Sequence, residues 1–268
     1  MIQLPRVVAL LCACSVSGFF PHLTTTRTTS RYPVVVLTAV DIAEVESLEI
    51  ASNFMVNAFW LNSPQGLVTS FSPGDLQALV SEQLNDLQDK YGERMGRRSL
   101  DTRLLQATND NKLVGIVGVE VSLLDKNLGD IIPATQSEEL LKNAVASLGP
   151  KQRRQYMKSS AREIAMELLP AHLEPVAVLS NLVVSPDARR QGIAKELCSA
   201  VETIAKEEWG YEQVYLRVES ANEAAKKLYK TKLGFASEYT LLEGTGIRVN
   251  DGRFAAVPAE ILVMVKSL

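Results

Sequence analysis

The residues best suited to chemistry form a short loop between a strand and a helix. Residues 176–184 are rich in β-branched side chains and predict a buried strand. Arg189 and Arg190 follow, and their guanidinium groups are suited to binding phosphate. Gly192 allows the backbone to approach a bulky anion, and a helix predicted from Ile193 directs free N–H groups and its positive dipole end toward the loop. The arrangement predicts an anion-binding cradle.

Two common phosphate-binding loops do not fit this pattern. The loop lacks the Gly-x-x-x-x-Gly-Lys-Ser/Thr spacing of nucleoside triphosphate sites. Gly115 and Gly118 lie inside the apolar run 113–121, and no helix follows them as a dinucleotide fingerprint requires. These glycines instead predict a strand that another part of the chain, or a ligand, approaches closely.

Histidine and cysteine offer little for catalysis. His22 and His172 are the only histidines, so a Ser-His-Asp arrangement or a His-based zinc site would depend on His172, which we expect in a solvated loop. Cys198 lies on the apolar side of the helix after the cradle and is predicted to be a core residue. We expect no metal site.

The first 40 residues differ in composition from the rest and contain no acidic residue. Residues 1–18 have the basic start, short apolar run and small residues of a secretory signal, too short to span a bilayer. A hydroxylated, basic segment follows Phe19, and the two pieces resemble the bipartite leaders of complex plastids. Residues 1–33 are therefore predicted to be a signal and transit peptide, a plain secretory or disordered N-terminus being the alternative.

The charge of the chain argues against nucleic acid as a partner. The whole sequence of 268 residues carries a net charge of −3, and removal of residues 1–33 would leave 25 basic and 31 acidic residues, a net of −6. The predicted mature part, residues 34–268, has the composition of a globular domain, and we expect no stable membrane insertion.

Hydrophobic periodicity and turn residues predict a mixed sheet with helices on both faces, an α/β fold. The predicted elements are a strand at 34–40, a helix at 42–59 with Asp41 as N-cap, a helix at 72–92, strands at 102–108 and 113–123 around a turn at 109–112, helices at 137–148 with Ser137 as cap and at 151–169, the strand at 176–184, a helix at 193–208, a strand at 213–218, a helix at 221–230, and strands at 235–241 and 260–265 around a loop at 243–258. The helices between 125 and 174 are predicted to be an insertion.

The cradle and two later motifs resemble one known family. Arg-Arg-Gln-Gly-Ile-Ala at 189–194 matches the Arg/Gln-x-x-Gly-x-Gly/Ala loop of the GCN5-related N-acetyltransferases (GNAT). Asn222 and Tyr229, followed by Leu-Gly-Phe at 233–235, are similar to the second motif of this family. Leu-Ser-Asn-Leu-Val-Val at 179–184 is also similar to its plastid members. The resemblance implies the GNAT fold for residues 34–268.

The resemblance also implies a cosubstrate, acetyl-CoA, and a role for each matching residue. The pyrophosphate would lie on the amides of 189–194, the pantetheine arm would pair with the strand like an extra strand, Asn222 would bond its amides, and Tyr229 would protonate the leaving thiolate. An amine would attack the thioester directly. The cofactor-binding residues so implied are Leu182, Val183, Val184, Arg189, Arg190, Gln191, Gly192, Ile193, Ala194 and Asn222.

Two features depart from the family pattern. Four residues separate Tyr229 from Gly234 where the family commonly has three, and we expect the extra residue at the helix end. Some members use a Glu on the central strand as general base, but Ser180 and Asn181 occupy those positions. The candidate bases are Glu120, Glu174 and Glu219, or a chain of waters. A non-catalytic acyl-CoA-binding module stays open as an alternative, and the acceptor could be a protein N-terminus, a lysine or a small amine.

Overall fold

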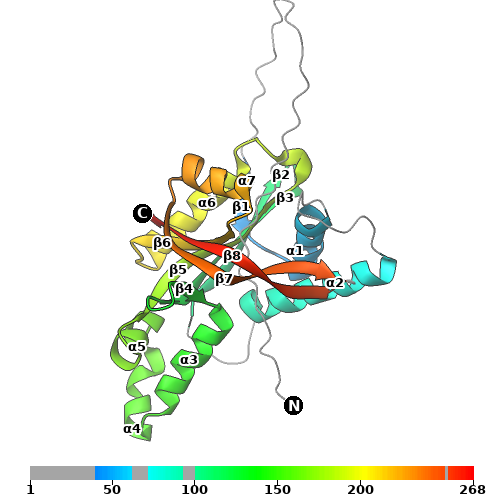
Figure 1. Cartoon of the computed structure of the whole chain (residues 1–268). Helices are drawn as coiled ribbons and strands as arrows, with labels where there is room; N and C mark the ends of the chain where they lie inside the picture. The colour runs from blue at the N-terminus through cyan, green and yellow to red at the C-terminus, as the bar shows by residue number, and fades with distance from the viewer. Residues whose placement is uncertain (1–39, 62–71, 93–99, 251–252) are drawn as a thin grey trace, which may run out of the picture.

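The computed structural model describes residues 40–61, 72–92, 100–250 and 253–268. These residues form an eight-stranded sheet in the order β1-β2-β3-β5-β6-β8-β7, and β4 pairs with β3 beside this path (Figure 1). Only β5 and β6 pair in parallel; the other neighbours are antiparallel. The strands are β1 (Asp41–Glu44), β2 (Thr102–Asn109), β3 (Lys112–Asp125), β4 (Asp130–Ile132), β5 (Leu173–Val184), β6 (Gln213–Glu219), β7 (Ala236–Asn250) and β8 (Arg253–Ser267). The predicted mixed sheet is confirmed.

The first helix begins later than the sequence predicted. Asp41 does not cap a helix; it begins β1 and pairs with Thr108 of β2. Helix α1 (Leu48–Met55) begins after Ser47, whose Oγ accepts a hydrogen bond from the N–H of Ile50 at 3.4 Å. The extended run before Ser47 completes the sheet edge, and this pairing outweighs the helical spacing of its apolar residues. The strand predicted at 34–40 lies, except for Val40, outside the described residues.

Helix α2 (Pro73–Tyr91) begins where its capping sequence predicts. The Oγ of Ser72 accepts from the N–H of Asp75 at 3.1 Å, and the Asp75 carboxylate accepts from the N–H of Ser72 at 3.3 Å. The helix runs to Tyr91, whose side chain reaches the sheet. This capping box fixes the start of α2.

The insertion after β3 contains more and shorter helices than predicted. Helix α3 (Ala134–Ala146) begins before Ser137, whose buried Oγ accepts from the N–H of Leu123 at 3.0 Å and so ties the helix to β3. The single helix predicted at 151–169 is interrupted: α4 (Pro150–Arg153) and a 3-10 turn, η2 (Gln155–Lys158), precede α5 (Ala161–Leu168). The break occurs because Ser160 forms a new capping box for α5.

Alternate side chains of β3 face opposite sides of the sheet. Val117, Val119 and Val121 belong to the larger core cluster, which includes residues of α3, α5, α6 (Ile193–Thr203) and α7 (Glu223–Lys227). We call this side the α6 face. Ile116 instead packs in a cluster with residues of α1 and α2, and we call that side the α2 face. Helices therefore lie on both faces, as predicted.

The two glycines of β3 allow a close approach on opposite faces. A Cβ on Gly115 would lie 2.9 Å from Cδ1 of Leu197 on α6. A Cβ on Gly118 would collide with the hydroxyl of Tyr91 and would lie 2.6 Å from Oγ of Ser180. The expectation that side chains approach this strand closely is confirmed.

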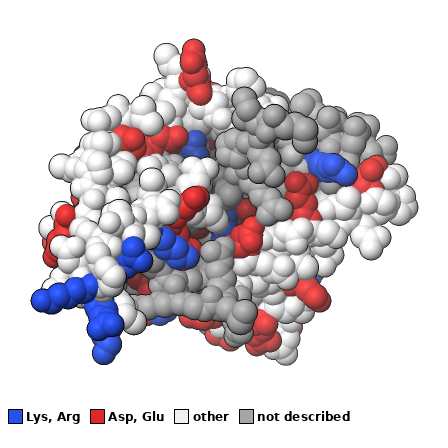
Figure 2. All heavy atoms as spheres, turned by 90° about the horizontal axis from the view of Figure 1, so that it is seen from below, with Lys and Arg blue, Asp and Glu red and all other residues white. Residues whose placement is uncertain are grey.

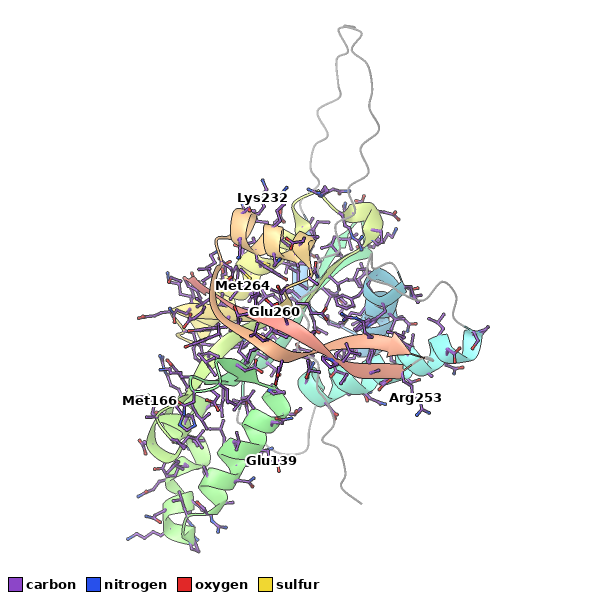
Figure 3. All side chains as sticks on the ribbon, in the orientation of Figure 1. Glu139, Met166, Lys232, Arg253, Glu260 and Met264 are labelled. Atoms are coloured by element: carbon purple, nitrogen blue, oxygen red, sulfur yellow. The ribbon has the colours of Figure 1, made fainter. Side chains whose placement is uncertain are left out.

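The C-terminal strands form a long hairpin rather than two short strands and a loop. The β7–β8 pairing runs from Ala236–Val265 to Asn250–Arg253, so most of the loop predicted at 243–258 is paired strand. Its glycines serve packing: a Cβ on Gly244 would lie 2.6 Å from Cγ1 of Ile261. Figures 1 and 3 show the hairpin extending beside α2, with Arg253 near its end.

The far end of this hairpin contacts the α2 face. The ring of Phe254 lies 4.9 Å from that of Trp60, measured between centroids. The Phe254 N–H donates to Oε2 of Glu82 on α2 at 2.8 Å. These contacts hold the hairpin against α2 and against the π-helical segment η1 (Val56–Leu61) that follows α1.

Candidate functional site

The predicted cradle has the backbone conformation of an exposed helix start. Strand β5 leads through a 3-10 turn, η3 (Pro186–Ala188), to α6, which begins at Ile193. Arg190 and Gly192 adopt left-handed φ angles of 66° and 90°. The Gly192 carbonyl accepts from the N–H of Lys195 at 2.8 Å, and the preceding N–H groups have no acceptor within the helix by position. The loop therefore presents the positive end of α6.

Arg189 braces this loop. Its Nε donates to the carbonyl of Val184 at 3.2 Å, and its Nη2 donates to the carbonyl of Ala58 at 3.1 Å. The guanidinium thus joins the end of β5 to η1 and brings positive charge close to the cradle. The sequence predicts a phosphate-binding role for Arg189 and gives no signal for this bracing contact.

The remaining side chains of the loop differ in how far they are exposed to solvent. Arg190 is exposed and Ala194 is half-buried. Gln191 is exposed, and its Nε2 donates to the carbonyl of Asp187 at 3.2 Å. Ile193 is buried in the α6-face core. Of the predicted anion-binding side chains, Arg190 is therefore the one best placed to meet a ligand from solvent.

The parallel pairing of β5 with β6 ends early. The described register pairs only Ala177 with Val214 and Val178 with Tyr215, although both strands continue beyond. The predicted pantetheine segment, Leu182 to Val184, lies past this point, and on its other side Val183 and Val184 pair with β3. The edge of β5 that faces β6 is therefore unpaired with β6 in the described register at the segment where the pantetheine arm was predicted to pair.

Asn222 and Tyr229 lie on the element that follows β6. Asn222 is the N-cap of α7, and its Oδ1 accepts from the N–H of Ala225 at 3.1 Å. Tyr229 is fully buried, with its ring centroid 5.7 Å from that of Phe235. A π-helical turn, η5 (Leu228–Leu233), ends at the left-handed Gly234. A π-turn holds one residue more than an α-turn, so it accommodates the fourth residue after Tyr229 at the helix end.

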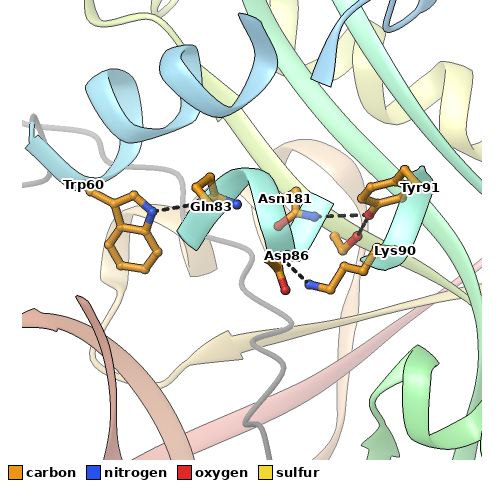
Figure 4. A network of polar contacts seen from close by, with 7 residues as sticks. Trp60, Gln83, Asp86, Lys90, Tyr91 and Asn181 are labelled. Carbon is orange, nitrogen blue, oxygen red and sulfur yellow. Dashed lines mark hydrogen bonds and ion pairs between the residues drawn. The ribbon is translucent and has the colours of Figure 1, made fainter. Parts of the chain in front are cut away.

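A β-bulge interrupts β5 beside the predicted pantetheine segment. The register shifts between Ile116 and Gly118, so two β5 residues oppose one β3 residue, and Asn181 adopts a left-handed φ of 53°. Oγ of Ser180 lies 2.9 Å from the hydroxyl of Tyr91, and Nδ2 of Asn181 donates to that hydroxyl at 3.1 Å (Figure 4). Sequence reasoning missed both the bulge and Tyr91; Asn within an apolar strand was the available signal.

Glu120 is a fully buried carboxylate on the α2 face of the sheet. It pairs across the ladders with Thr102 and Val178, and among the described residues neither carboxylate oxygen has a hydrogen-bond partner of good geometry. Burial raises the pKa of this carboxyl to about 7, although the Lys90 ammonium opposes the rise. Asp86, which Lys90 contacts at 3.0 Å, raises the Glu120 pKa further, and the Tyr91 hydroxyl lowers it.

The two other candidate bases are paired with cations. Glu174 is half-buried at the start of β5 and forms an ion pair with Lys126. Glu219 is buried, and both of its oxygens accept from Arg248, at 2.7 and 2.8 Å. Neither carboxylate resembles Glu120, which lacks such a pair within the described part of the chain.

Cys198 is buried in the α6-face core, as predicted, and His172 lies in the turn before β5.

In the described residues, no group of three or more histidine, cysteine or acidic side chains is placed to hold a metal ion. No helix of the same residues is long and apolar enough to cross a membrane. Figure 2 shows a face with acidic side chains scattered over it and several basic ones gathered at one corner.

Comparison with known proteins finds a family model that matches part of the chain. Residues 152–235, which span β5, the cradle, α6, β6, α7 and Tyr229, match the model described as the acetyltransferase (GNAT) family. We call residues 152–235, which match this family model, the GNAT segment. It contains every residue that the resemblance assigned to the cofactor. No curated protein matches the sequence.

Three solved acetyltransferase structures are similar to this chain at low sequence identity. An acetyltransferase of the GNAT family from Streptococcus pneumoniae is 15% identical, with a TM-score of 0.46, and the match covers 86% of this chain and 100% of that one. The ribosomal-protein-S18-alanine N-acetyltransferase of Escherichia coli is 14% identical, with a TM-score of 0.44, over 85% and 94% of the two chains. A spermidine N-acetyltransferase SpeG chimera, from Vibrio cholerae and hSSAT, is 14% identical, with a TM-score of 0.45, over 86% and 96%.

Proposed function

We propose that this chain is an N-acetyltransferase that transfers the acetyl group of acetyl-CoA to a primary amine by direct attack in a ternary complex. The supporting observation is the early end of the β5–β6 ladder beside an exposed helix start. A polar arm could pair with the β5 edge while its phosphates bind the amino end of α6. Both features lie in the GNAT segment, whose family uses acetyl-CoA.

The residues present fit the two ends of this cosubstrate. The amides of 189–194 and the exposed Arg190 suit the pyrophosphate, because a helix N-terminus and a guanidinium both favour anions. Main-chain groups of Leu182 to Val184 suit the pantetheine amides. The amide nitrogen of Asn222, which the α7 cap does not use, is a further donor for them.

The bulge at Asn181 and the Tyr229 hydroxyl suit the reacting end. Acetyl-CoA supplies a thioester whose carbonyl carbon accepts the amine. A break in the β5 ladder can direct main-chain groups at the thioester carbonyl and polarise it. The Tyr229 hydroxyl can protonate the departing thiolate, because the two groups have comparable basicity.

Titration of the protein with acetyl-CoA, followed by an assay of CoA release with amines, tests the proposal. The protein should bind acetyl-CoA at micromolar concentration and release CoA only when an amine is added. Binding without release for any amine would favour the alternative of a non-catalytic acyl-CoA-binding module. If Gly192→Glu kept both acetyl-CoA binding and CoA release, the result would contradict the proposed site.

The acceptor and the localisation of the protein are also proposals. A protein N-terminus, a lysine or a small amine all fit, and mass spectrometry of a peptide library incubated with enzyme and acetyl-CoA would distinguish them. Residues 1–39 lie outside the described part, so delivery to a plastid rests on the leader sequence. A fluorescent protein fused behind residues 1–33 should enter plastids, and secretion or cytosolic retention would contradict this.

A further inference from the structure

Glu120 is a buried carboxylate of the α2 face whose oxygens, within the described residues, accept no hydrogen bond from a cation. Asp86 contacts Lys90, and Glu219 is bound by Arg248 through both oxygens. Glu120 is fully buried, and neither of its oxygens has a well-formed hydrogen bond within the described residues. A buried carboxylate without such bonds destabilises a fold, so a functional reason for it is expected.

The position of Glu120 relative to the bulge supplies that reason. Gly118 pairs with Ser180, and Glu120 pairs with Val178 two residues along the same strands, so Glu120 lies about 7 Å from the bulge on the same face. The Tyr91 hydroxyl acts on the Glu120 carboxyl and also contacts Ser180 at 2.9 Å and accepts from Asn181 at 3.1 Å. Gly118 leaves the room for this hydroxyl to reach the strand.

We propose that Glu120 accepts the proton of the acceptor ammonium, with the Tyr91 and Ser180 hydroxyls linking it to the amine at the β5 bulge. The inference rests on the proposed acetyltransferase function. It also places the general base on β3, next to the strand where the family commonly carries a glutamate and where this chain has Ser180 and Asn181.

The proton balance of the step is complete. The acceptor ammonium gives one proton to Glu120 and becomes a neutral amine. Its nitrogen forms a bond to the thioester carbon, and the carbon–sulfur bond breaks. The Tyr229 hydroxyl gives its proton to the thiolate, and the second nitrogen proton, released as the amide forms, restores the Tyr229 hydroxyl. Glu120 then releases its proton to water before the next turnover.

The charged groups around Glu120 set the pH at which it can act. The titratable groups that act on it all lie on α2: Lys90, Asp86 and Tyr91. Its neighbours on β2 and β5, Thr102 and Val178, do not titrate. Because burial holds the carboxyl pKa at about 7, it is ionised and able to accept a proton just above neutral pH.

The test measures CoA release by the full-length chain between pH 5.5 and 9.5 with three probe amines: spermidine, an Nα-blocked lysine and an alanyl peptide with a free N-terminus. The wild-type kcat/KM should rise to a plateau through about pH 7. In Glu120→Gln the value at pH 7.5 should fall about 100-fold and should follow only the ionisation of the amine, with acetyl-CoA affinity unchanged. Tyr91→Phe should lower the plateau and keep the rise near pH 7.

Glu174→Gln is the matched control, because the Glu174 side chain is half-buried and paired with Lys126, and this variant should match the wild type. Glu120→Gln with a wild-type pH profile would overturn the role of Glu120 and leave the acetyltransferase function standing. A wild-type chain that binds acetyl-CoA but releases no CoA with any of the three probes would overturn the function and this role together.

Discussion

Gly192 is the position where two substitutions separate the effect of backbone strain from that of anion binding. Its φ of 90° is unfavourable for a residue with a Cβ, but an added Cβ would meet no atom within 4 Å. Gly192→Ala should therefore cost about 1–2 kcal/mol of stability through conformation alone. For a chain of this size, that cost corresponds to a fall in melting temperature of about 2–8 °C. Gly210, with a φ of 72° and equally open surroundings, is the matched control.

Gly192→Glu adds a charge to the same strain. A carboxylate about 6 Å from a phosphate in a medium of effective dielectric constant near 20 is repelled by about 3 kcal/mol per charge. This repulsion corresponds to a loss of acetyl-CoA affinity of more than 100-fold.

Calorimetric titration of Gly192→Glu and Gly210→Glu, with melting curves for all four variants, measures both effects. The paired variants should lose similar stability, and only Gly192→Glu should lose acetyl-CoA binding. Equal affinity of Gly192→Glu and Gly210→Glu for acetyl-CoA would refute the assignment of the pyrophosphate to this loop.

Three further predictions concern the site. Tyr229→Phe should lower the turnover number with little change in acetyl-CoA affinity, and wild-type turnover would remove its role as acid. Asn222→Ala should lose the α7 cap and about 1 kcal/mol of stability, whereas Asn222→Asp should keep the melting temperature and still bind acetyl-CoA about 10-fold less tightly. The pKa of Glu120 is raised from 4.5 to about 7, so the folded state holds the extra proton and stability falls as pH rises through that interval, by at most about 3 kcal/mol. The melting temperature of Glu120→Gln relative to wild type should therefore increase between pH 4.5 and 7; a difference independent of pH would contradict the shift.

The parts of the fold that could be predicted from the sequence are those fixed by local signals. Ser72 and Asp75 form the capping box of α2, and the turn at 109–112 joins β2 to β3. The β-branched run at 176–184 is strand within β5, and the helix after Gly192 begins at Ile193. In each case the residues that define the element lie within a few positions of one another.

The parts that failed depend on contacts between distant segments. Glycines in 243–258 indicated a loop, but Gly244 serves the close packing of Ile261 across a strand pair. Asp41 is a residue type that favours a helix N-cap, but it pairs with Thr108, which lies far along the chain. Tyr91 is the last residue of α2, and no local sequence signal predicts its contact with Ser180, which lies 89 residues later. The residues proposed to bind the pyrophosphate lie close together in the sequence. The residues proposed for proton transfer come from distant segments and are brought together only by the fold.

Hydrogen–deuterium exchange of the chain with and without acetyl-CoA tests the central claim most directly. Main-chain amides in 189–194 and in the β5 segment Leu182 to Val184 should exchange more slowly when acetyl-CoA is bound. The amide of Gly210 and the amides of the hairpin beyond Gly244 should not change. Protection confined to segments outside β5 and the cradle, or none at saturating acetyl-CoA, would contradict the account.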